Sequence, residues 1–208
     1  MTNIQCDLIC VGGGYAGLSA ASRAAQLGLK VMVLEKGEDS LYACNSRYAG
    51  GVMHVSYHNP KDSASVLTQA IRQISNAYAD PHLTQVIAKQ AGRAVDWLHS
   101  EGAQYARVGS VGWRQWILAP LRPAVTQMDW QGRGADMALR SLEKNLLQRE
   151  GRLVRGAMVK ELLMKEGACI GVRAEVAGNT QDFYAKAVVL ADGGFQGNLE
   201  MVGRYNSP

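Results

Sequence analysis

The stretch IQCDLICVGGGYAGLSAASRAAQLGLKVMVLEK, residues 4–36, decides the fold. Residues 4–11 become apolar toward their end and predict a buried strand, and Lys30–Leu34 is a continuous apolar run typical of a central parallel strand. Between them, the alanine-rich run Leu18–Leu27 favours a helix, and Gly28 stands where a left-handed C-cap belongs. This order of strand, glycine loop, helix and strand predicts a Rossmann-like βαβ unit at residues 1–36.

The glycines between strand and helix follow the pattern Gly12-x-Gly14-x-x-Gly17. In such a loop the first glycine allows a tight turn, the second lets the backbone approach a pyrophosphate, and the third lets the helix pack closely on the strand. The helix N-terminus then faces the phosphates. Glu35, at the end of the second strand, is placed to accept hydrogen bonds from the ribose of an ADP moiety and disfavours a 2′-phosphate. The sequence therefore predicts dinucleotide binding.

The rest of the chain changes its periodicity between its middle and its last third. Apolar stripes predict helices at Ser63–Tyr78, Leu83–Leu98 and about Ala135–Arg149, the first two with Val66, Ala70, Ile71, Ile74 and Tyr78, and with Val86, Ile87, Ala91, Ala94, Val95 and Leu98, on their apolar faces. Short strands are expected at Arg152–Gly156, Val159–Lys165, Ala168–Ala177, Thr180–Tyr184 and Ala187–Ala191, with turns at Glu166-Gly167 and Gly178-Asn179.

These elements predict an α/β fold class. We expect a Rossmann-like FAD/NAD(P)-binding three-layer domain with a parallel sheet. A helical insertion would occupy about residues 60–150, and a β-meander with a return strand would occupy residues 152–195.

Composition excludes several classes of protein. The chain has 208 residues, of which 47% are hydrophobic and 19% charged, which is ordinary globular usage and argues against disorder or a coiled coil. The net charge of +4 comes from scattered basic residues, so no nucleic-acid partner is expected. The four cysteines show neither a CxxC nor a zinc spacing, so no metal site is expected. There is no apolar run of about 18 residues and no signal peptide, so we expect a cytoplasmic protein without a membrane span.

Four motifs give the chain a family resemblance. They are Gly12–Gly17 with Glu35-Lys36, Asn45-Ser46 with Ala49-Gly50-Gly51, Gly132-Arg133-Gly134, and Leu190-Ala191-Asp192-Gly193-Gly194-Phe195. In these motifs the sequence resembles the fumarate reductase/succinate dehydrogenase flavoprotein superfamily. Its soluble branch includes flavocytochrome-type fumarate reductases, 3-ketosteroid dehydrogenases and tricarballylate dehydrogenases. The resemblance covers nearly the whole chain, so residues 1–208 are expected to be one FAD-binding domain.

The resemblance assigns roles to particular residues. The diphosphate loop would be Gly12, Gly13, Gly14, Tyr15, Ala16 and Gly17, and Glu35, followed by Lys36, would hold the adenosine ribose. The loop containing Asn45, Ser46, Ala49, Gly50 and Gly51 would run along the flavin. Val159 would clamp the adenine by backbone contacts, and Ala191, Asp192 and Gly193 would lie near the diphosphate and adenosine.

The sequence departs from the family at several of these positions. Members that hold FAD covalently carry a histidine just before the flavin-loop glycines, where this chain has Cys44 and Asn45, so FAD is expected to be non-covalent. Asp192 stands where threonine or alanine is usual, and an acid near a diphosphate needs a donor or a water. Family members also continue past this length into a capping domain, the proton-transfer residues and a second FAD-binding segment. We therefore expect either a fragment of a larger enzyme or a truncated product, with an exposed apolar surface that favours self-association.

The expected function is that of an FAD-dependent oxidoreductase. It would transfer a hydride between the flavin and a C–C or C=C bond next to a carbonyl or carboxylate, with a small carboxylate or enone as substrate. One alternative is a non-catalytic FAD-binding fragment, and another is an NAD-binding Rossmann protein, which the flavin loop and the meander oppose. No catalytic residue is identified. His54 is the histidine nearest to the flavin loop, and Arg47 would meet a substrate carboxylate, the flavin or a structural acid.

Overall fold

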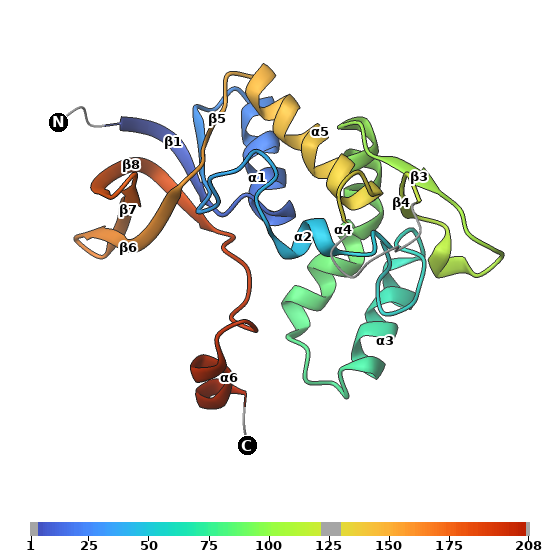
Figure 1. Ribbon diagram of the computed structural model, residues 1–208. Coiled ribbons are helices and arrows are strands. Elements are labelled where there is room, and N and C mark those ends of the chain that lie inside the picture. Colours follow the sequence, from blue (N-terminus) through green and yellow to red (C-terminus); the bar gives the residue numbers. More distant parts are fainter. Residues whose placement is uncertain (1–3, 122–129, 207–208) are drawn as a thin grey trace. The chain divides into compact units, whose positions relative to one another are not determined.

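A computed structural model describes residues 4–121 and 130–206 of the chain (Figure 1). The chain divides into two compact units, and each is described by itself. The first unit comprises Met1–Asn45 with Asn145–Pro208, and the second comprises Ser46–Lys144. The glycine loop and the strands that surround it all belong to the first unit.

The first unit is built on a six-stranded sheet of order β5-β2-β1-β8-β7-β6. Strands β5, β2, β1 and β8 pair in parallel, and β8, β7 and β6 pair as an antiparallel meander. The elements are β1 (Ile4–Val11), α1 (Tyr15–Gln26), β2 (Val31–Leu34), β5 (Arg152–Val154), β6 (Ala157–Lys165), β7 (Ala168–Val176), β8 (Asn179–Leu190) and α6 (Leu199–Tyr205). The predicted α/β class with a parallel sheet and a meander is confirmed.

Helix α1 begins three residues earlier than the alanine-rich run suggests. Gly14 is its N-cap in an extended conformation, so Tyr15, Ala16 and Gly17 form the first turn rather than part of a preceding loop. At the other end, Gly28 follows the helix with a φ of +79°, as the C-cap prediction requires. The glycine loop is therefore short, and only Gly12, Gly13 and Gly14 separate the end of β1 from the start of the helix.

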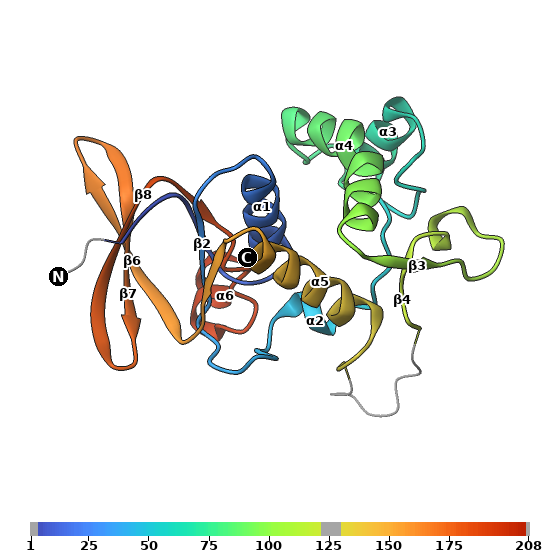
Figure 2. The same ribbon diagram turned by 90° about the horizontal axis from the view of Figure 1, so that it is seen from above.

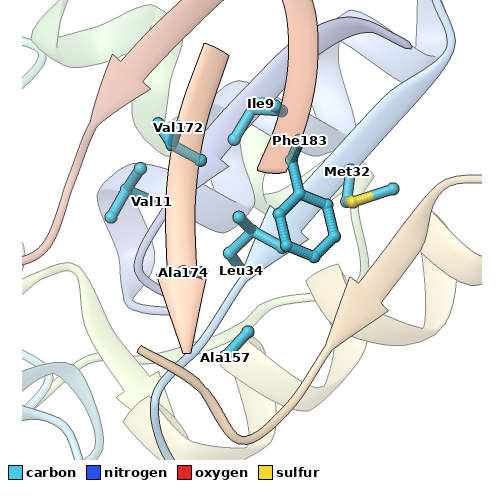
Figure 3. Packing of buried hydrophobic residues seen from close by; sticks show 8 residues of the cluster. All are labelled: Ile9, Val11, Met32, Leu34, Ala157, Val172, Ala174 and Phe183. Carbon is cyan, nitrogen blue, oxygen red and sulfur yellow. The ribbon is translucent and has the colours of Figure 1, made fainter. Parts of the chain in front are cut away.

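The core of the first unit lies between the parallel strands and the meander. Side chains alternate along β1 and β2, so Ile9, Val11, Met32 and Leu34 share one face. They pack against Ala157, Val172, Ala174 and Phe183 of the meander strands (Figure 3). Helix α1 contacts β1 and β2 as well, and Figure 2 shows it on the side of these strands opposite the meander. The three layers are thus meander, parallel strands and helix.

Strand β8 differs from the prediction because it is one continuous strand of 12 residues instead of two short ones. Its first part pairs antiparallel with β7, and its later part, from Phe183 onward, pairs in parallel with β1. The turn before it has Ala177 and Gly178 at its centre, both with positive φ, one residue earlier than predicted. The predicted turn at Glu166-Gly167 is confirmed, because both of these residues also have positive φ values.

The second unit is mostly helical. Its elements are α2 (Asn45–Tyr48), whose first residue closes the first unit, α3 (Ala64–Ile74), α4 (Pro81–Ser100), β3 (Gln104–Ala106), the 3-10 turn η1 (Gly112–Arg114), β4 (Ile117–Ala119) and α5 (Gly134–Gln148), whose last residues belong to the first unit. The small hairpin of β3 and β4 falls between the predicted helices that end at Leu98 and begin at about Ala135, where the sequence predicted no strand. Three residues per strand are too few to show a period in the sequence.

The apolar faces of α3 and α4 only partly agree with prediction. Ala70, Val95 and Leu98 are buried as expected, and Leu67, Thr84 and Ala88 are also buried. In contrast, exposed side chains include Val66, Ile74, Tyr78, Val86 and Ile87, and also Leu83. The two helices contact each other, and their buried residues include both small and large side chains, so the predicted stripes are only partly covered. Within the described ranges, no helix is long and apolar enough to cross a membrane.

A buried ion pair joins α2 to α5 in the second unit. The guanidinium of Arg47 donates to the carboxylate of Asp136, and both side chains are fully buried. Arg140 donates to the other oxygen of Asp136 at 2.5 Å, and the amide of Gly132 donates to it at 2.8 Å. Trp130 packs on the Arg47 guanidinium, 5.7 Å from its ring centre. The sequence left three roles open for Arg47. Its bond to Asp136 corresponds to one of them, a structural salt bridge.

The Asp136 carboxyl makes the stability of the fold depend on acid. Burial raises the pKa of Asp136, but the hydrogen bonds from Arg140, Gly132 and Arg47 outweigh it and hold the pKa below its usual range. A depressed pKa stabilises the folded state above the unfolded pKa of about 4, and this contribution is lost as the pH falls through the folded value. Acid should therefore weaken the α2–α5 connection below about pH 4.

Replacing Asp136→Asn tests this assignment. We expect the free energy of unfolding at neutral pH to fall by about 3 kcal/mol, because the fully buried ion pair between Arg47 and Asp136 is broken. The pH dependence of stability between about pH 5 and pH 3 should also flatten. Urea unfolding at several pH values measures both effects, with the exposed Asp62→Asn as a control of equal charge change. Identical pH profiles for wild type and Asp136→Asn would contradict the assignment.

Candidate cofactor site

A cavity of about 440 Å³ opens at the carboxyl ends of the parallel strands in the first unit. Its walls come from the ends of β1, β2 and β8 and from the first half of β6. The lining residues are Val11, Gly12, Leu34, Glu35, Lys36, Ala157, Met158, Val159, Lys160, Glu161, Leu162, Leu190 and Asp192. Open α/β sheets bind their ligands at this edge, where strands leave toward opposite faces. The volume is within the range of small-molecule sites.

Close packing of the backbone explains two of the loop glycines. Gly12 has a φ of +98°, and a Cβ there would lie 2.5 Å from the carbonyl oxygen of Ala191. A Cβ on Gly17 would collide with the carbonyl oxygen of Gly12. The Ala191 amide donates to the Val11 carbonyl at 2.9 Å and so keeps the return strand against the loop. The loop is thus compact enough for its backbone to line the cavity.

The start of α1 supplies amides for an anion. The first hydrogen bond of the helix runs from the Leu18 amide to the Gly14 carbonyl at 2.9 Å, so the amides of Ala16 and Gly17 have no partner within the helix. The helix N-terminus also carries a partial positive charge. Together these features suit the diphosphate of a dinucleotide.

Glu35 is the buried acid of this site, with 5% of its surface exposed. Its carboxylate accepts a hydrogen bond from the Gly13 amide at 2.7 Å and another from the Gly37 amide at 2.8 Å. A carboxylate offers about four acceptor positions, so about two remain after these bonds. Because Glu35 also lines the cavity, those positions fit the two hydroxyls of a ribose. The residues present therefore fit a dinucleotide.

The remaining residues predicted for the adenosine end lie around the same cavity. Lys36, Val159 and Asp192 line it, and the neighbouring Gly193 is exposed. Asp192 is exposed as well, so water is available to separate its charge from a phosphate. The lining also brings in residues that the sequence did not indicate, among them Met158 and Glu161. They belong to an ordinary-looking strand, and only the pairing of β6 places them at the cavity.

The flavin-loop residues divide between the two units. Asn45 ends the first unit, whereas Ser46, Ala49, Gly50 and Gly51 belong to the second. The Gly51 carbonyl accepts a hydrogen bond from the Leu118 amide at 2.8 Å, and a Cβ on Gly51 would lie 3.1 Å from the Leu118 side chain. A Cβ on Gly50 would meet open space. The end of this loop is thus fixed to β4, and Gly50 keeps an open backbone surface.

His54, the histidine nearest to the flavin loop in the sequence, lies among aromatic side chains of the second unit. His54 accepts a hydrogen bond from the Tyr57 amide at 3.1 Å and stacks on the Tyr57 ring. Its other aromatic neighbour is Trp113, at 5.6 Å between ring centres. In the part of the chain that the structure describes, no group of three or more histidine, cysteine or acidic residues is arranged for a metal ion.

Comparison with known proteins agrees with the geometry. A family model described as FAD binding domain matches residues 7–207. The chain is 30% identical to urocanate reductase of Eggerthella lenta, over 96% of this chain and 33% of that protein. It is 29% identical to fumarate reductase (cytochrome) of Shewanella frigidimarina, over 96% of this chain and 35% of that protein. The chain thus spans about one third of the length of these curated relatives.

Solved structures share the fold. A 3-ketosteroid-Δ4-(5α)-dehydrogenase from Rhodococcus jostii RHA1 superposes with a TM-score of 0.79 at 20% identity, over 97% of this chain and 48% of that one. An open form of a flavocytochrome c3 fumarate reductase gives 0.78 at 22% identity, over 97% of this chain and 36% of that one. The family match covers nearly all of the chain, including the glycine loop, Glu35 and the return strand, and the chain belongs to the FAD-binding domain family.

Proposed function

We propose that this chain is the FAD-holding part of an oxidoreductase that acts on a C–C or C=C bond next to a carbonyl or carboxylate. The observation that carries the proposal is the cavity, which is lined by Gly12 of the close glycine turn and by Glu35, a buried acid with acceptor positions to spare. Helix α1 begins three residues after Gly12 and adds its N-terminal amides to the same loop. The names of the relatives support the reaction class, since they are a urocanate reductase and a fumarate reductase, and urocanate and fumarate are both α,β-unsaturated carboxylates.

The proposed division of labour places the adenosine half of FAD in the cavity of the first unit. Glu35 binds the ribose, Val159 lies at the adenine, and Gly12 to Gly17 bind the diphosphate. The segment from Asn45 to Gly51 contacts the flavin. When bound, FAD supplies the hydride chemistry, and the protein orients it and limits its exposure to water. The attachment is non-covalent, because Cys44 and Asn45 replace the histidine that covalent members carry.

Reoxidation of the reduced flavoprotein tests the activity. The purified chain with FAD is reduced without oxygen, and α,β-unsaturated carboxylates and enones are added while the visible absorption of the flavin is followed. We expect at least one compound to restore the oxidised spectrum faster than buffer does. If the flavin binds but no compound accelerates reoxidation, the alternative of a non-catalytic FAD-binding chain replaces this proposal.

We also propose that the protein works in a reducing compartment and that it self-associates. The four cysteines are free thiols, which suits a reducing compartment such as the cytoplasm.

The exposed apolar side chains of α3 and α4 favour self-association. Sedimentation velocity should show a concentration-dependent shift to species larger than the monomer, and a clean monomer at high concentration would contradict it.

A charge-matched pair of variants tests the role of Glu35. Glu35→Gln removes the negative charge and one acceptor oxygen from the ribose position, so the Kd for FAD should rise at least about tenfold, the equivalent of about 1.4 kcal/mol. The exposed Glu38→Gln changes the net charge equally and should leave the Kd unchanged within about twofold. Quenching of flavin fluorescence measures both values. Equal Kd values for the two variants would remove Glu35 from the proposed site.

A further inference from the structure

We infer that Tyr42 is a positioning residue for FAD, because its phenol sets the direction of the Gly14 amide in the diphosphate loop. The inference rests on the proposed binding of the diphosphate at Gly12 to Gly17. The sequence contains no pattern that points to Tyr42, which lies between Glu35 and the flavin loop that begins at Asn45. It is one of the largest fully buried side chains, with 2% of its surface exposed.

The hydroxyl of Tyr42 donates a hydrogen bond to the carbonyl oxygen of Gly13 at 2.7 Å. The amide of the same glycine donates to Glu35 at 2.7 Å. Both backbone polar groups of Gly13 are therefore held by side chains that follow β2. The Gly13 amide is thereby engaged by Glu35, which leaves the next amide along the loop, that of Gly14, as the candidate for contact with a phosphate.

Peptide geometry transmits the Tyr42 contact to Gly14. The carbonyl of Gly13 and the N–H of Gly14 belong to one planar peptide group, and in the usual trans form they point in opposite directions. The bond from Tyr42 to the carbonyl therefore aims the Gly14 N–H away from Tyr42. If this bond is lost, the peptide rotates more freely, and the amide must be ordered when the ligand binds.

The same ring explains a glycine that dinucleotide binding leaves unexplained. Position 13 is a variable position of the Gly12-x-Gly14 pattern, yet a Cβ on Gly13 would lie 2.6 Å from the Tyr42 hydroxyl oxygen. A Cβ on Gly37 would collide with the Cβ of Tyr42. Glycine at both positions provides the space for the ring. Gly13 is thus accounted for by Tyr42 rather than by a phosphate.

The test compares Tyr42→Phe with Tyr105→Phe. Both changes remove a phenolic hydroxyl that donates to a backbone carbonyl. The Tyr105 hydroxyl donates to the Val95 carbonyl at 3.3 Å in the second unit. We expect Tyr42→Phe to raise the Kd for FAD about tenfold, as loss of one hydrogen bond would. Tyr105→Phe should leave it unchanged. A merely structural role predicts lower melting temperatures for both variants and the same Kd as wild type, which would overturn the inference.

A second measurement needs no FAD. Hydrogen exchange of the Gly14 amide in the FAD-free chain should be at least several-fold faster in Tyr42→Phe than in wild type or Tyr105→Phe. An unchanged exchange rate would overturn the inference whether or not FAD binds, whereas a wild-type chain that fails to bind FAD would refute the proposed function alone. If Tyr42→Phe does not fold, Gly13→Ala probes the same contact from the loop. It should weaken FAD binding and speed Gly14 exchange, and wild-type values for both would count against the inference.

Discussion

The first unit depends on the two hydrogen bonds that the carboxylate of Glu35 accepts. This carboxylate is buried at the end of β2, yet it accepts hydrogen bonds from an amide of the glycine loop and from an amide just beyond its own strand. A buried charge of this kind is tolerated because charge-assisted hydrogen bonds replace water. The acid therefore fixes the loop after β1 to the segment after β2. That connection shapes one side of the cavity before any ligand arrives.

The return strand supplies the opposite side. Because β8 continues from the meander into parallel pairing with β1, its end at Leu190 lies beside the end of β1 at Val11. The Ala191 carbonyl then occupies the space where Gly12 would carry a side chain. A strand that ended earlier would leave this space open. The length of β8 and the glycine at position 12 are thus two parts of one constraint.

The sequence predicted the βαβ unit well because its signals are local. A buried strand, a glycine turn and an alanine-rich helix are each visible within a few residues, and the acid at position 35 follows from their spacing. Tyr42 and Met158 were missed because their roles arise from contacts with distant segments. The burial predicted for the apolar faces of α3 and α4 was only partly correct. Apolar periodicity shows which residues share a face but not whether a partner covers that face. The hairpin of β3 and β4 was too short to show a period.

We propose that these 208 residues hold FAD without a covalent bond. The most direct measurement denatures the purified chain with heat, separates the precipitate and quantifies the flavin in the supernatant per chain. We expect FAD in the supernatant at close to one molecule per chain, either as purified or after incubation with FAD. A chain that takes up no flavin, or a flavin that stays with the precipitate, would contradict it.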